Sequence, residues 1–132
     1  MTARPKVDFA KIDCEQGWHR PEGAPEGVSV KILAGALGHM AKQGHCTTLT
    51  RWRAGTEVTQ AITHDYIEEV YVISGALQWL GADGETAVEA NSFVCRHAGV
   101  PHGPFRADED YLQPSFAITL TLAADAAIRQ PF

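Results

Sequence analysis

The sequence predicts an all-β protein, folded as a β-sandwich or a small barrel. Short stretches that alternate apolar and polar residues recur at intervals of about 8–12 residues, with turn signals between them. Glycine and proline, 12 and 7 of the 132 residues, fall mostly at these predicted turns. Sustained helical periodicity is nearly absent. A chain of this length is expected to form one domain around a single core.

The ends of the chain are expected to lie outside the main body. Residues 1–27 predict an extended arm, because prolines and glycines recur along them and favour a turning chain: Pro5, Gly17, Pro21, Gly23, Pro25 and Gly27. We expect this arm to lie over the body or over a partner subunit. The body is assigned to residues 28–122. Residues 123–132 form a tail whose alanine-rich start predicts one or two helical turns.

The first part of the body predicts two strands joined by a loop. Residues 28–33 (VSVKIL) alternate apolar with polar, and residues 46–52 (CTTLTRW) are rich in β-forming residues. Three glycines between these strands, in residues 34–44, predict a loop, with a short helical turn over 37–42 as the alternative. A turn at residues 53–56 then leads into an extended segment.

Residues 62–75 (ITHDYIEEVYVISG) predict a strand with metal-binding side chains at its start. His64 precedes Glu68 by four positions, and a run of β-branched and aromatic residues follows. Side chains alternate between the two faces of a strand. Glu68 therefore shares the apolar face that carries Val70, whereas the adjacent Glu69 points the other way. We expect Glu68 to be the inward carboxylate.

The last part of the body predicts a hairpin, a loop and two further strands. Residues 76–89 form the hairpin, with the sequence GADG at its turn. Residues 92–96 and 115–122 are the remaining predicted strands. Between them, residues 97–104 (HAGVPHGP) predict a loop whose glycines and prolines determine its path.

Composition argues against several kinds of partner. The formal charge of −5 and the lack of a Lys/Arg cluster argue against nucleic acid and anionic membranes. No apolar stretch approaches the ~20 residues that cross a bilayer, and the N-terminus lacks the apolar segment of a secretory signal. We therefore expect a cytoplasmic protein. Both faces of residues 70–73 are apolar, which predicts burial on either side and a homodimer.

The spacing of these residues resembles the cupin superfamily. The residues that match its first motif are Gly55, His64, Glu68 and Gly75, and those that match the end of its second motif are Gly99, Val100, Pro101 and His102. The resemblance covers residues 28–122 and is similar to small RmlC-like cupins and to the zinc-binding cupin half of ChrR-type anti-sigma factors. It implies a double-stranded β-helix, the jelly-roll barrel of the cupins.

The resemblance also implies a metal site formed by His64, Glu68 and His102. Two imidazoles and one carboxylate are the donors of a facial triad, which binds a divalent ion such as Fe, Mn, Ni or Zn and leaves positions for substrate. Ile62 occupies the position of the first metal-binding histidine in the family, so one of four ligands is missing. The alternative is a metal-free cavity in which His64 and Glu68 form a hydrogen-bonded pair.

Two functions are compatible with this pattern. The first is a metal-dependent enzyme that acts on a small oxygenated metabolite, as a dioxygenase of diketone-like or enolisable substrates or as an isomerase or lyase. The second is a non-catalytic module that binds or senses a small molecule or a metal. Other side chains that could reach the site are His45, His97, Arg51, Arg53 and Arg96. An inward arginine would anchor a carboxylate, although we expect Arg51 and Arg53 to be solvated.

Overall fold

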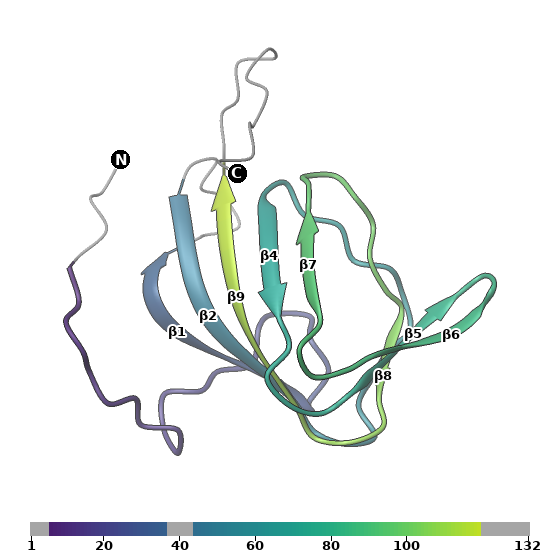
Figure 1. The fold of residues 1–132 in the computed structure, drawn as a ribbon, viewed down its shortest axis with the longest axis horizontal. Helices are drawn as coiled ribbons and strands as arrows, with labels where there is room; N and C mark the ends of the chain where they lie inside the picture. Colours follow the sequence, from purple (N-terminus) through teal and green to yellow (C-terminus); the bar gives the residue numbers. More distant parts are fainter. Residues whose placement is uncertain (1–5, 37–43, 120–132) are drawn as a thin grey trace, which may run out of the picture.

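The computed structural model describes residues 6–36 and 44–119, and their strands form two antiparallel sheets (Figure 1). In chain order the strands are β1 (Val28–Ala36), β2 (Gly44–Trp52), β3 (Glu57–Val58), β4 (Ile67–Tyr71), β5 (Leu77–Gly81), β6 (Gly84–Val88), β7 (Phe93–Arg96), β8 (Phe105–Ala107) and β9 (Tyr111–Thr119). The five-stranded sheet has the order β1-β2-β9-β4-β7, and the four-stranded sheet has the order β3-β8-β5-β6. This architecture confirms the predicted all-β jelly roll. No helix in this part of the chain could span a membrane.

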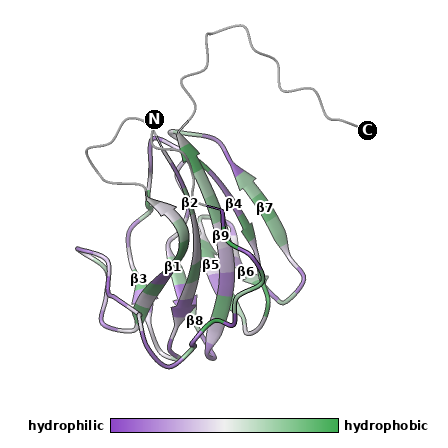
Figure 2. Ribbon diagram, turned by 90° about the vertical axis from the view of Figure 1, so that its left-hand side faces the viewer, coloured by the Kyte–Doolittle hydropathy of each residue, from purple (hydrophilic) through white to green (hydrophobic). Residues whose placement is uncertain are grey.

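The core lies between the two sheets at the end where they approach each other. Trp52 from the five-stranded sheet meets Phe105 from the four-stranded sheet edge to face, with ring centroids 6.3 Å apart. The other buried members of this cluster are Val28, Val72, Leu77, Ala107 and Tyr111. Because each strand alternates inward and outward side chains, both sheets contribute apolar residues to one layer. Figure 2 shows hydrophobic residues along β7 and in the C-terminal half of β9.

Strand β4 has the side-chain alternation that the sequence predicts. Val70 and Val72 are 3% and 2% exposed, whereas Tyr71 and Ile73 are 44% and 48% exposed. Glu68 shares the inward face with Val70, and Glu69 is exposed. The strand ends at Tyr71, earlier than its β-branched sequence suggests. Beyond it Ile73 and Ser74 still form backbone hydrogen bonds with Leu112 of β9 before the chain turns toward β5.

Two strands differ from the sequence-based expectation at the C-terminal end. β8 was not predicted, because three residues between turns carry too little periodic signal. β9 begins at Tyr111 and not at residue 115, and it includes Pro114, which pairs with Leu49 of β2. Proline is unusual inside a central strand. Pro114 immediately precedes Ser115, the first residue of β9 that pairs with β4.

The arm approaches the body at only part of its length. His19 forms a backbone bridge with Val30 of β1, and residues 21–25 line the interior cavity. Residues 6–15 are exposed and run away from the sheets (Figure 1), whereas the carbonyl of Gln16 accepts a hydrogen bond from Lys31 Nζ of β1. Two predicted segments, the helical turn over 37–42 and the tail 123–132, lie outside the described residues.

Replacing Gly75 by alanine is expected to destabilise the protein by about 3 kcal/mol or more. Gly75 has a φ of +80°, and a Cβ there would collide with the backbone carbonyl of Asp110. Left-handed backbone alone costs an alanine about 1–2 kcal/mol. The matched control is Gly55→Ala, with a φ of +86° and open space around the new methyl. Chemical denaturation of both variants measures the difference, and equal losses would contradict the collision.

Candidate metal centre

Two loops and one strand bring His64, Glu68 and His102 together. Glu68 lies on β4, His64 lies in the segment that leads into β4, and His102 lies in the loop that follows β7. The two loops are joined by backbone hydrogen bonds. The amide of Ile62 donates to the carbonyl of His102 over 2.7 Å, and the amide of His102 donates to the carbonyl of Ile62 over 2.9 Å. A third bond, from the amide of Gly99 to the carbonyl of His64, also ties the loops together.

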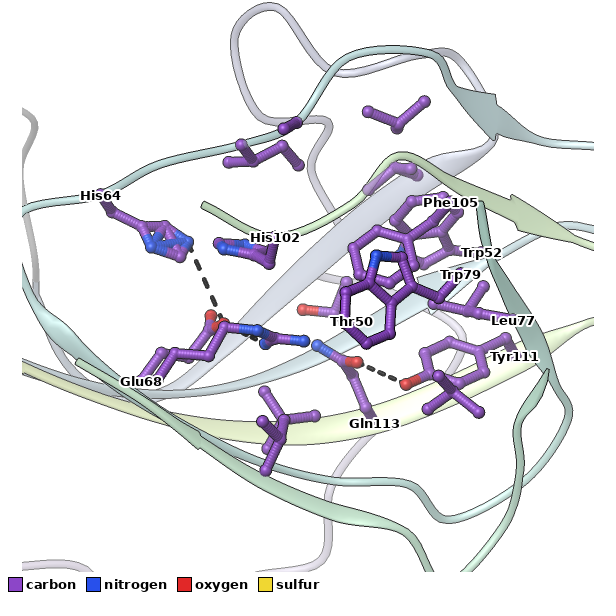
Figure 3. A pocket seen from close by; sticks show the side chains of 18 of the residues that line it. Thr50, Trp52, His64, Glu68, Leu77, Trp79, His102, Phe105, Tyr111 and Gln113 are labelled. Atoms are coloured by element: carbon purple, nitrogen blue, oxygen red, sulfur yellow. Dashed lines mark hydrogen bonds and ion pairs between the residues drawn. The ribbon is translucent and has the colours of Figure 1, made fainter. Parts of the chain in front are cut away.

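The three side chains converge inside the barrel. One donor atom from each lies within 4.8 Å of those from the other two. The ring centroids of the histidines are 4.4 Å apart, and His64 Nε2 is 4.0 Å from Glu68 Oε1. The side chains of His64 and Glu68 are 16% and 15% exposed, and His102 is 9% exposed. In Figure 3 both rings lie on the same side of the carboxylate.

The donor set fits a divalent transition metal. Ligand bonds of about 2.0–2.2 Å place two donors on one ion roughly 3–4 Å apart, so the observed separations need only a small contraction. Imidazole nitrogen and carboxylate oxygen are the donors that Fe, Mn, Ni and Zn accept. Within the described part of the chain, these residues are the group of donors that could hold an ion. His64, Glu68 and His102 would therefore be its ligands.

Burial keeps the two imidazoles in the neutral, ligating form. Burial and the nearby Arg96 cation lower the pKa of His64, partly offset by Asp65. The pKa of His102 is lowered to about 4 by burial, then by Arg96 and His64. Burial raises the pKa of Glu68, although its ion pair with Arg96 opposes this shift. Neutral imidazoles are the protonation state that metal binding requires.

Arg96 is the arginine that points inward. It lies opposite Glu68 in the register of β4 and β7, and its Nη1 donates to Glu68 Oε1 over 3.1 Å. Its side chain is 19% exposed. Arg51 and Arg53 are exposed, as expected, and Arg51 stacks on Trp18 of the arm. The sequence left Arg96 as one of three candidate arginines and could not single it out, because cross-strand register cannot be obtained from one strand.

The remaining candidates lie outside the group of convergent donors. His97 is exposed at the rim of the cavity, and His45 lies on β2. Ile62 lines the cavity next to His102, so the position of the missing histidine does face the site. Tyr66, which the sequence analysis did not single out, stacks on His64 with ring centroids 4.3 Å apart. The only feature of the sequence that could have indicated this contact is the two-residue spacing, which places Tyr66 and His64 on the same face of an extended chain.

The convergent donors open into a cavity of about 1140 Å³ between the sheets. One wall is apolar and includes Trp52, Leu77 and Phe105, and the amide of Gln113 lies between this wall and Glu68 (Figure 3). The hydroxyl of Tyr111 donates to Gln113 Oε1 over 2.6 Å. A cavity of this size accommodates a small organic molecule beside the three donors.

Known structures share this fold. An acetylacetone dioxygenase from Acinetobacter johnsonii is 17% identical with a TM-score of 0.63, over 86% of this chain and 75% of that one. An RmlC-like cupin from Shewanella frigidimarina is 15% identical with a TM-score of 0.60, over 86% and 94%. The polyketide cyclase RemF from Streptomyces resistomycificus is 14% identical with a TM-score of 0.61, over 86% and 81%.

The protein is an all-β jelly roll with a His/Glu/His cluster inside its cavity. The chain has the cupin fold, as its motifs predict. No protein-family model matches the sequence, and no curated protein matches it. These three structures are 14–17% identical to this chain, so they establish the fold and not the reaction.

In the metal-free protein, the His102 imidazole is expected to titrate near pH 4 instead of 6.5. Because the unfolded chain takes up this proton at about pH 6.5, the contribution of His102 to stability is complete above that pH and is lost as the pH falls toward 4. Glu68, whose pKa is raised, has the opposite effect: its contribution to stability increases as the pH falls, because the folded state takes up this proton first. Proton NMR of the His102 ring, assigned with a His102→Asn variant, measures the pKa of this imidazole separately from that of Glu68. A midpoint at or above 6.5 would contradict it.

Proposed function

We propose that this protein is a cytoplasmic, metal-dependent enzyme that acts on a small oxygenated metabolite, as a dioxygenase of diketone-like or other enolisable substrates. The observation that carries the proposal is the convergence of His64, Glu68 and His102 within 4.8 Å at the inner wall of a cavity. The similarity of its fold to an acetylacetone dioxygenase supports the same class of reaction. Isomerisation or elimination at an enolisable carbon would use the same donors.

One group of residues would bind the ion, and a second group would surround the substrate. Neutral His64 and His102 with anionic Glu68 would hold a divalent ion, which when bound polarises enolate oxygens and activates dioxygen. Three protein ligands leave open positions for those oxygens. Trp52, Phe105 and their apolar neighbours exclude water from the substrate body.

Metal analysis followed by oxygen uptake tests this proposal. Protein purified without chelators is analysed for metals, then loaded with Fe(II) without air and mixed with β-diketones and hydroxy-ketones. We expect one redox metal per chain and substrate-dependent oxygen consumption that is lost in Glu68→Gln. Stoichiometric metal without any turnover on enolisable compounds would contradict a dioxygenase.

A second candidate function is a non-catalytic module that binds a small molecule without metal. Two observations favour it: Ile62 replaces a ligand of the family motif, and Arg96 already neutralises Glu68 at 3.1 Å. In that case the purified protein contains no metal, and a small molecule occupies the cavity. The same metal analysis therefore separates the two candidates.

We also propose that the protein is a homodimer through the outer face of β4 and β7. Tyr71 and Phe93 lie opposite each other in register and are 44% and 63% exposed, beside Ile73 at 48%. A contiguous apolar face of this kind is typical of an interface. Light scattering after size exclusion is expected to give twice the chain mass, and Phe93→Asp is expected to shift it toward the monomer. Ile32→Asp, exposed on β1, is the matched control.

A further inference from the structure

The side chain that distinguishes this cavity from a simple metal site is Arg96. Its position follows from the sheet, because Glu68 and Arg96 are direct partners in the antiparallel register of β4 and β7. Opposed residues place their side chains on the same face. Both therefore point into the cavity, where the guanidinium is 19% exposed and donates one hydrogen bond to Glu68.

Arg96 also provides the fixed positive charge of the cavity. Of the described residues that line it, Arg96 is the only arginine or lysine. Glu22 and Glu57 line it too, but both are exposed at the surface. The charge that a ligand meets in the interior is therefore determined by Arg96, Glu68 and any bound ion.

The guanidinium of Arg96 has N–H groups that Glu68 does not use. Arginine carries five N–H groups in a planar fork, and within residues 6–36 and 44–119 the guanidinium of Arg96 donates to Glu68 Oε1. A single bond through Nη1 leaves the other groups of the fork for a ligand. The planar fork matches the two oxygens of a carboxylate.

Adding a divalent ion makes an anionic ligand necessary for charge balance. Glu68 and Arg96 cancel each other, and the two histidine ligands are neutral, so a bound ion leaves a net charge of +2 in the interior. Uncompensated charge inside a cavity with apolar walls is costly. An anion that binds next to both the ion and Arg96 removes this cost.

We propose that Arg96 binds a carboxylate of the substrate, so that the enzyme prefers small oxo acids with an apolar body over neutral diketones. This inference rests on the metal-dependent function proposed above and narrows its substrate class. The carboxylate pairs with the guanidinium, the adjacent carbonyl oxygen faces the three metal ligands, and the apolar part lies against Trp52, Leu77 and Phe105. Arg96 is thus a specificity-determining residue.

Two ligands of nearly equal shape test the proposal. Benzoylformate carries a carboxylate beside a ketone, and 1-phenylpropane-1,2-dione carries a neutral acetyl group in its place. Each is titrated calorimetrically into Zn-loaded wild type, Arg96→Gln and Arg53→Gln. The last variant removes the same charge from an exposed arginine outside the cavity. Zinc content is measured for every sample, and folding is checked by circular dichroism.

The expected result is a wild type that binds benzoylformate at least about 10-fold more tightly than the dione. Arg96→Gln should weaken benzoylformate by about 10- to 100-fold, the loss expected for a charge-assisted pair, and should change dione binding by less than about 3-fold. Arg53→Gln should leave both affinities unchanged. A wild type without preference for the carboxylate, or an Arg96→Gln variant with unchanged benzoylformate affinity, would overturn the proposal.

Failure of the metal proposal has a separate readout. If wild type takes up no zinc, the metal-dependent function fails whatever the affinities are. If zinc is bound at one per chain and the carboxylate preference is absent, only the role of Arg96 fails. Should Arg96→Gln not fold, Arg96→Lys keeps the charge without the fork and is expected to bind benzoylformate several-fold more weakly. In that case the wild-type preference between the two ligands still decides the question.

Discussion

Substitution of His102 by alanine is expected to lower the affinity for a divalent metal by about 100-fold or more. His102 is 9% exposed, and its ring lies 4.4 Å from that of His64. Loss of an outer-shell partner already costs about 10- to 100-fold in metal sites, and loss of a direct ligand exceeds that. Two remaining protein donors would hold an ion only weakly. Equilibrium dialysis with Zn(II) or Mn(II) measures the change.

The matched control for this substitution is His97→Ala. His97 lies in the same loop but is exposed and outside the group of convergent donors, so its removal should alter metal affinity by less than about 2-fold, as for an ordinary surface change. Circular dichroism establishes that both variants fold. Equal affinities of the two variants would show that His102 does not bind the ion.

Substitution of Ile62 by histidine is expected to raise metal affinity by about 10- to 100-fold. Ile62 lines the cavity and is joined to His102 by two backbone hydrogen bonds. A histidine there has its side chain beside the three donors and supplies the fourth ligand of the cupin motif. A metal-bound imidazole is worth at least as much as the outer-shell contacts that cost about 10- to 100-fold when lost.

The control for the added ligand is Ile32→His, which places a new imidazole at an exposed position of β1. Nonspecific binding by an extra histidine would affect both variants alike, whereas a fourth ligand would strengthen binding only in Ile62→His. A lower affinity of Ile62→His than wild type would show that the histidine clashes with His102 and does not complete the site.

The fold class was predictable because it depends on local alternation. Successive residues of a strand face opposite sides, so the inward Glu68 and outward Glu69 followed from their neighbours. The hairpin followed from GADG at its turn. β8 was not predictable, since three residues between turns have no period to detect, and the early start of β9 was hidden by Pro114.

The sequence by itself determined an all-β chain with three candidate metal ligands at cupin spacing, because spacing and face are properties of the local chain. Only the tertiary structure decided what surrounds them. Arg96 meets Glu68 because β4 and β7 pair in one register, and a shift by one residue would turn Arg96 outward. Register depends on the packing of whole sheets, so the positive charge beside the candidate ligands could be located only in the folded protein.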